Sequence, residues 1–200
     1  MKRFFTEAEV DALTELINIG VSGAATRFSR MVRRSVALTV PAIGIVSPQQ
    51  AADMLESSIG GPLVAVEQEF AGGPSGRALL VFPKDHWDKL FRTVMAEEAP
   101  PADEAMLHDA MRETGNVLLQ GCLGSIGNLL ERSLSISVPR VVSGRAAELI
   151  AAPTEGVVVF VYVNFDVEGG EIRGYLALVL DFASLEQLRA LVGDFIKRVT

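Results

Sequence analysis

The sequence predicts an α/β fold of the α+β kind, in which two copies of one unit, related by a pseudo-twofold axis, share an antiparallel β-sheet flanked by helices. The first observation is a repeat: RSVALTVP at 34–41 returns as RSLSISVP at 132–139, an offset of 98 residues. The second is that both copies show the same order of predicted helices and strands. Twice the offset nearly fills the 200 residues, and a solenoid needs three or more copies. We therefore expect a single domain built of repeats 1–98 and 99–200.

The first repeat opens with a predicted helix over 6–31. Thr6 is a plausible N-cap, and Glu9 stands at the capping-box position three residues later. Apolar residues then alternate with smaller or polar ones over 36–40, which predicts a strand that ends at Pro41.

Turn residues and caps delimit the remaining elements. A Ser-Pro pair starts a short helix, the loop GGPSG joins two strands in a hairpin, and a serine caps the last helix. The segment EEAPP separates the two repeats, because its prolines end one helix. The predicted elements are a helix from Ser47-Pro48 to about 57, strands 63–70 and 77–82 around loop 72–76, a helix over 84–96, the separator 97–101, a helix from near Ala102, strands 157–166 and 171–180 around Gly169-Gly170, and a last helix capped by Ser184.

Composition excludes several classes of function. The net charge is −7 without a basic cluster, so nucleic acid is not an expected partner. One cysteine and two histidines cannot build a thiolate or histidine zinc site, and a single cysteine points to a reducing compartment. The N-terminus lacks the apolar core of a signal peptide, and the longest uncharged stretch, 114–130, is interrupted by amides and glycines. We expect a soluble cytoplasmic protein without membrane insertion.

A polar stripe runs along the first helix of each repeat. At about 100° per residue, its three side chains fall within an arc of about 60°, away from the apolar arc. Taken alone, such a stripe is typical of a solvated helix face. The same residue types recur at the same spacing in both repeats, however, and a proline follows each asparagine by 23 residues. The stripes are Asp11, Glu15 and Asn18 with Pro41, and Asp109, Glu113 and Asn116 with Pro139.

The doubled pattern Asp-x3-Glu-x2-Asn with its two prolines resembles the CheC/CheX/FliY family of chemotaxis phosphatases. Two intact motifs in 200 residues without a long extension are most similar to CheC. The resemblance covers essentially the whole chain and implies a CheC-like fold. The first motif departs from the family pattern because Ile17 replaces the usual glycine between glutamate and asparagine, whereas the second keeps Gly115.

The resemblance implies a hydrolase that removes the aspartyl-phosphate of a CheY-like response regulator in chemotaxis or two-component signalling. An amide can hold a water in line with phosphorus, and a carboxylate one turn away can pair with a lysine of the docked regulator. The protein would need no cofactor or metal of its own, since the regulator carries Mg²⁺. The implied roles are catalysis for Asn18 and Asn116 with Glu15 and Glu113, docking or helix support for Asp11 and Asp109, and architecture for Pro41 and Pro139.

Two other hypotheses stay open. In the first, the protein is a non-catalytic adaptor that binds a CheD-like receptor deamidase or a flagellar switch component. In the second, it is a structural duplicate without activity. Outside the stripes, loop 72–76 lacks the Gly-Lys-Ser/Thr end of a phosphate loop and is interpreted as a hairpin turn. We expect Cys122 to be a small buried hydrophobe, and Gly121, Gly124 and Gly127 to allow a close contact between helices.

Overall fold

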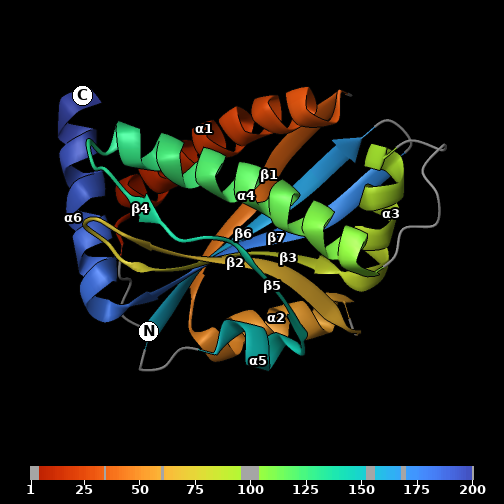
Figure 1. Ribbon diagram of the computed structural model, residues 1–200. Helices are drawn as coiled ribbons and strands as arrows, with labels where there is room; N and C mark the ends of the chain where they lie inside the picture. The colour runs from red at the N-terminus through yellow and green to blue at the C-terminus, as the bar shows by residue number, and fades with distance from the viewer. Residues whose placement is uncertain are drawn as a thin grey trace.

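A seven-stranded antiparallel sheet carries helices on both of its faces (Figure 1). The computed structural model describes residues 5–33, 35–59, 61–95, 104–151, 156–167 and 170–199. Four of the described helices contribute to the core on one face, and two cover the other. The predicted fold class is therefore confirmed. The first set is α1 (Glu7–Val32), α3 (Lys84–Met95), α4 (Glu104–Leu129) and α6 (Phe182–Val199), and the second is α2 (Pro48–Ile59) and α5 (Ala146–Ile150).

The strand order is symmetric about the centre of the sheet. It reads β1-β6-β7-β3-β2-β4, and β5 also pairs with β2. At the centre, Leu79 of β3 pairs with Ala177 of β7, the residue 98 positions later in the chain. Each half also gives an edge strand to the other, since β1 pairs with β6 and β5 with β2. The strands are β1 (Val36–Val46), β2 (Leu63–Ala71), β3 (Gly76–Pro83), β4 (Ser135–Ile136), β5 (Arg140–Gly144), β6 (Gly156–Val167) and β7 (Gly170–Asp181).

The first helix and the β2–β3 hairpin form where the capping and turn residues predict them. The Thr6 hydroxyl accepts the Glu9 N–H at 3.3 Å, and the Glu9 carboxylate accepts the Thr6 N–H at 2.6 Å, which completes a capping box. Ser47 and Gln50 make the same reciprocal pair at the start of α2. In the β2–β3 turn, Gly72 and Gly73 have φ of 130° and 135°, a conformation that favours glycine.

The prediction that the first strand ends at Pro41 is wrong, because β1 continues to Val46. Among the described strands, this one forms an edge of the sheet and pairs with β6 alone, and its register shifts between Thr39 and Ala42. An edge strand tolerates a proline at such an irregularity, since the missing N–H need not break the ladder. In the second half the strand is interrupted instead, and Pro139 lies between β4 and β5.

The cap of the last helix is also corrected. Asp181, at the end of β7, accepts the Ser184 N–H at 2.7 Å and so caps α6, whereas Ser184 lies inside the helix. This hydrogen bond lowers the pKa of the Asp181 carboxyl. The Ser184 hydroxyl instead contacts the hairpin, where it accepts the Ser75 N–H at 3.1 Å. The separator 97–101 and the helix start near Ala102 lie outside the described residues, as does Gly169.

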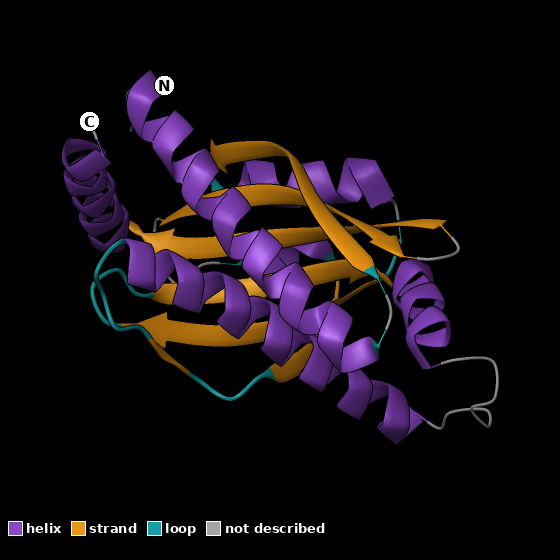
Figure 2. Ribbon diagram, turned by 90° about the horizontal axis from the view of Figure 1, so that it is seen from above, coloured by secondary structure: helices purple, strands orange, loops and turns teal. Residues whose placement is uncertain are grey.

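The two long helices cross on the sheet and pack through small residues (Figure 2). A Cβ atom added to Gly121 would lie 3.0 Å from the Ala24 Cα, and one added to Gly20 would lie 3.0 Å from the Cys122 carbonyl oxygen. The predicted use of Gly121 is confirmed. That of Gly124 and Gly127 is wrong: an added Cβ meets nothing within 4 Å at Gly124, and at Gly127 it meets the segment after α4.

The uncharged stretch 114–130 lies mostly in α4, where its apolar side chains belong to the core shared by α1, α4 and the sheet. Of the helices described, none is both long and apolar enough to cross a membrane. The polar residues of this stretch leave α4 with one buried face and one exposed face.

Burial raises the pKa of the Cys122 thiol to about 12, from an ordinary value of 9.0. Above about pH 9 an unfolded chain releases this proton, whereas the folded protein retains it until the pH approaches 12. The thiol's contribution to stability is therefore complete below pH 9 and is lost as the pH rises through this window. We expect the Tm to fall more steeply between about pH 8 and about pH 10.5 for the native protein than for Cys122→Ala. Parallel curves would contradict this assignment.

Candidate functional site

The predicted stripe on α1 faces outward. Asp11 and Glu15 are exposed and Asn18 is half-buried, whereas Leu13 and Ile17 on the opposite side are buried. The hydrophobic periodicity of α1 fixes this orientation, because its apolar side chains must face the sheet and α4. Glu15 and Asn18, three residues apart, project from neighbouring positions on one helix face.

The stripe on α4 repeats this arrangement. Asp109 and Glu113 are exposed and Asn116 is half-buried. Asp109 pairs with Arg112 at 2.8 Å, and both side chains are more than half exposed. An exposed pair of this kind contributes little to stability, so it leaves Asp109 free to exchange its partner for a basic group on a docking protein. Three residues after Asp11, at the position that corresponds to Arg112, stands Thr14, which has no charge to pair with Asp11.

The two stripes lie at opposite ends of the helix pair. α1 and α4 run in opposite directions through their crossing (Figure 2). Going forward along α1 from Gly20 to Ala24, the neighbouring residue of α4 goes back from Ile126 to Gly121. Both asparagines precede this crossing on their own helices. The molecule therefore presents two separate sites rather than one composite site.

The second site includes a residue that sequence reasoning missed. Gln68 of β2 is only 1% exposed, and its Nε2 donates to the Asn116 Oδ1 at 3.1 Å and to the Ser137 carbonyl oxygen at 2.8 Å. Among the described residues, the Gln68 Oε1 is buried without a hydrogen-bond partner. Leaving such an oxygen unpaired costs about 1–3 kcal/mol, so the placement of this amide is not explained by packing alone.

The first site lacks this contact. Gln68 pairs with Ala78 across the β2–β3 hairpin. The residue 98 positions after Ala78 is Leu176, and its partner in β6 is Val161. Val161 is fully buried and has no side-chain donor. Within the described part of the chain, no hydrogen bond holds the Asn18 side chain.

The residue before each asparagine also differs between the sites. A Cβ atom added to Gly115 would lie 2.4 Å from the Val66 Cβ, so α4 approaches β2 more closely than any side chain at this position would allow. At the corresponding position of α1, Ile17 is fully buried in the same core. The glycine therefore brings Asn116 within reach of Gln68.

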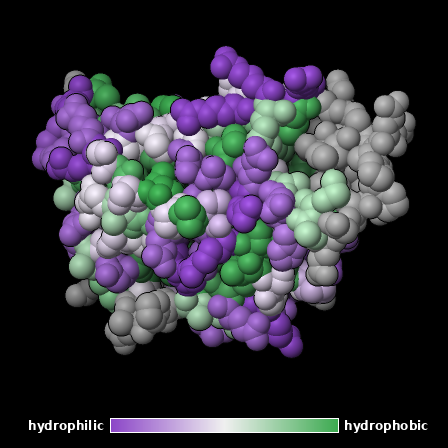
Figure 3. Space-filling model, viewed as in Figure 1, coloured by the Kyte–Doolittle hydropathy of each residue, from purple (hydrophilic) through white to green (hydrophobic). Residues whose placement is uncertain are grey.

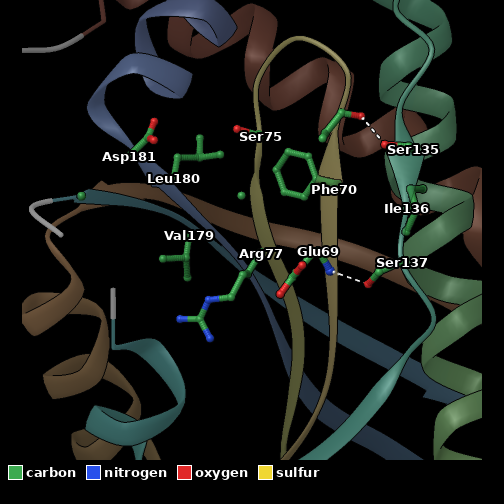
Figure 4. A pocket seen from close by; sticks show the side chains of 13 residues that line it. Glu69, Phe70, Ser75, Arg77, Ser135, Ile136, Ser137, Val179, Leu180 and Asp181 are labelled. Carbon is green, nitrogen blue, oxygen red and sulfur yellow. Dashed lines mark hydrogen bonds between the residues drawn. The ribbon is translucent and has the colours of Figure 1, made fainter. Parts of the chain in front are cut away.

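A cavity of about 650 Å³ lies beside the second site at the turn end of the β2–β3 hairpin (Figure 4). Its lining includes Ser135, Ser137, Arg77, Glu69 and Asp181, and none of the stripe side chains. On the α2–α5 side of the sheet, the buried Glu67 carboxylate accepts hydrogen bonds from Arg77 at 2.9 Å and from Arg140 at 2.6 Å. These charges satisfy one another, which is typical of a structural ion pair.

The chemistry that the two sites offer is that of amides and carboxylates. Neither stripe contains a serine, cysteine or histidine nucleophile between its aspartate and its asparagine. Among the described residues, no group of three or more His, Cys, Asp or Glu is placed to hold a metal ion. An amide can orient a water through its carbonyl oxygen and donate through its NH₂ group, and a carboxylate can pair with a cation of a partner.

The surface around the second site combines polar and apolar groups. Met106 is 45% and Val138 is 80% exposed, on either side of the stripe in sequence. In the space-filling view, hydrophilic and hydrophobic side chains alternate across the face on which α4 lies (Figure 3). Mixed surfaces of this kind are common in protein interfaces.

The sequence matches one family model and is similar to two known phosphatases. The family model of the chemotaxis phosphatase CheX matches residues 64–164. The CheY-P phosphatase CheC of Bacillus subtilis (strain 168) is 22% identical over 202 residues, which cover 94% of this chain and 95% of CheC. The flagellar motor switch phosphatase FliY of the same organism is 26% identical over 139 residues, or 68% of this chain, but the match spans only 36% of the length of FliY.

Solved structures share the fold. FliY of Thermotoga maritima superposes with a TM-score of 0.74 at 21% identity, covering 96% of this chain and 98% of that one. The FliM middle domain of H. pylori superposes with a TM-score of 0.65 at 11% identity, covering 94% and 99%. At these identities the likeness shows the architecture alone, and it confirms the CheC-like arrangement of helices on an antiparallel sheet.

Proposed function

This chain belongs to the CheX family of chemotaxis phosphatases, and from that premise we propose that it hydrolyses the aspartyl-phosphate of a CheY-like response regulator. The observation that carries the proposal is the pair of outward-facing stripes, each with an asparagine beside an exposed glutamate. The substrate is itself a folded protein, so an exposed helix face suits it better than a deep pocket.

Each asparagine has the chemistry to place the attacking water. An acyl phosphate is already reactive, so the catalyst needs to hold a water in line with phosphorus rather than to form a covalent intermediate. The amide carbonyl of Asn18 or Asn116 would accept a hydrogen from the water, and the NH₂ group would donate to a neighbouring oxygen. Their half-buried positions restrict the side chains while leaving them accessible.

The glutamates have the chemistry to orient the regulator. Glu15 and Glu113 are exposed one turn before the asparagines, where a carboxylate can pair with a lysine near the regulator's phosphate. Asp11 and Asp109 extend the acidic face by a further turn and would support docking. The Mg²⁺ ion in this proposal belongs to the regulator and is not held by this chain.

The experiment that tests the proposal follows phosphate loss from a phosphorylated CheY-type regulator with and without the chain. We expect acceleration that saturates with regulator concentration. In the combined Glu15→Ala and Glu113→Ala variant, KM should rise by about tenfold with a smaller change in kcat, because the carboxylates act mainly through docking. Asn128→Ala, an exposed amide on α4 outside the stripe, is the matched control and should behave as the native chain.

Two results would overturn the proposal. One is the absence of acceleration for regulators that the chain demonstrably binds. The other is the absence of acceleration together with stable binding of a CheD-like deamidase or a flagellar switch component, which would favour the adaptor hypothesis.

A further inference from the structure

We propose that Gln68 is a positioning residue of the second site, which presets the orientation of the Asn116 amide, and that the first site works without such a residue. This inference rests on the proposed function, because it assigns Gln68 a role in the same hydrolysis. It follows from the hydrogen bonds that join β2, the segment after β4 and α4.

The chain of donors and acceptors begins at a fixed point. Ser137 is tied to β2 by two hydrogen bonds, since its N–H donates to the Glu69 carbonyl oxygen at 2.9 Å and its hydroxyl accepts the Glu69 N–H at 2.9 Å. Figure 4 shows the second of these contacts beside the bond from the Ser135 hydroxyl to Ala71. The Ser137 carbonyl oxygen is thereby held in place.

This carbonyl decides which way the Gln68 amide faces. A carbonyl oxygen can only accept, so the group of Gln68 that lies 2.8 Å from it must be the NH₂ group. The second hydrogen of that NH₂ group is then directed at Asn116, 3.1 Å away. The reversed orientation would place the Gln68 Oε1 against the Ser137 oxygen, with two acceptors in contact.

The same logic then fixes Asn116. Because Gln68 donates, the atom of Asn116 that faces it must be the carbonyl oxygen Oδ1, and the NH₂ group of Asn116 points away from Gln68. The Oδ1 atom keeps one lone pair for a further donor such as a water. An amide that already has one orientation places the water at a lower entropy cost, because the side chain does not have to be ordered when the regulator docks.

Packing alone does not account for Gln68. In the other half of the molecule Val161 fills the equivalent place in β6, so the fold accepts an apolar side chain there. Gln68 instead sits in an apolar layer with its Oε1 unpaired among the described residues. A residue that destabilises the core and contacts the candidate catalytic amide is better explained by its effect on that amide.

The test separates the two sites. The Asn18→Ala variant keeps only the second site intact, and the Asn116→Ala variant keeps only the first. Adding Gln68→Met, which is of similar length and lacks the donor, should lower kcat about tenfold in the Asn18→Ala background with KM unchanged, and should leave kcat unchanged in the Asn116→Ala background. An equal loss in both backgrounds would indicate a structural role and overturn the proposal, as would no loss in either.

A second measurement does not depend on turnover. Relaxation of the side-chain ¹⁵NH₂ groups by NMR should give a higher order parameter for Asn116 than for Asn18, and Gln68→Met should lower the Asn116 value toward that of Asn18. If Asn116 is as mobile as Asn18 in the native chain, Gln68 does not position it, whatever the activity. If the order parameters differ as expected but neither single-site variant accelerates phosphate loss, the proposed function fails while the hydrogen-bonded arrangement stands.

Discussion

Replacing both Asn18 and Asn116 by alanine is expected to return phosphate release to the regulator's own rate. Each asparagine is proposed to hold the attacking water, and with both removed neither helix face keeps a group that can place it. Loss of one well-placed polar group typically lowers a rate by about 100-fold or more, so the acceleration by the chain should disappear. The measurement is the regulator's phosphate loss at saturating concentrations of the variant.

The fold should survive this change. Both side chains are half-buried at the surface of their helices, and alanine is the best helix former. The Tm should stay within a few degrees of the native value, and the variant should still bind the regulator through its glutamates. Retained acceleration in a folded double variant would show that the amides are not catalytic, and each single variant should keep the activity of the other site.

The repeat in the sequence was enough to predict the symmetry of the fold. An offset of 98 residues relates the two strands at the centre of the sheet, and Leu79 pairs with its own counterpart Ala177. Helical periodicity was likewise enough to predict which side of α1 and α4 faces the solvent, because burial of an apolar arc fixes the opposite face.

The edge strands could not be predicted in the same way. Pro41 reads as the end of a strand, but whether a proline ends one depends on which side of the strand is paired, and only the tertiary structure decides that. The cap of α6 shows a related limit. Asp181 and Ser184 are both good N-cap residues, and the choice between them depends on where β7 ends.

The contact of Gln68 with the second site could not be predicted from the sequence, for two physical reasons. Gln68 lies 48 residues from Asn116 in the chain, so no local spacing connects them. The equivalent position in the second repeat holds Val161. Comparing the two repeats identifies the stripes because they occur twice, but it cannot identify a glutamine that occurs once. The signal was a lone glutamine on the otherwise apolar, core-facing side of β2, between Val66 and Phe70, since a buried amide needs a partner.

Gly115→Ala is expected to destabilise the protein and to impair the second site. The added Cβ would lie 2.4 Å from the Val66 Cβ, and a stiff β-branched side chain in a packed strand cannot move aside cheaply. Overpacking of this kind costs about 1–3 kcal/mol, which for a chain of this size lowers the Tm by roughly 2–12 °C. Relief requires α4 to move away from β2, which would lengthen the bond between Gln68 and Asn116.

The same substitution elsewhere on α4 provides the control. A Cβ added to Gly124 meets nothing within 4 Å, so Gly124→Ala should gain about 0.5–1 kcal/mol from helix propensity and leave the activity of both sites unchanged. Two identical changes on one helix are thus expected to shift the Tm in opposite directions. In the Asn18→Ala background Gly115→Ala should lower kcat by about tenfold or more, whereas in the Asn116→Ala background the first site should still work at temperatures where the variant is folded. If Gly115→Ala instead raises the Tm as Gly124→Ala does, α4 does not approach β2 closely enough for Gln68 to reach Asn116.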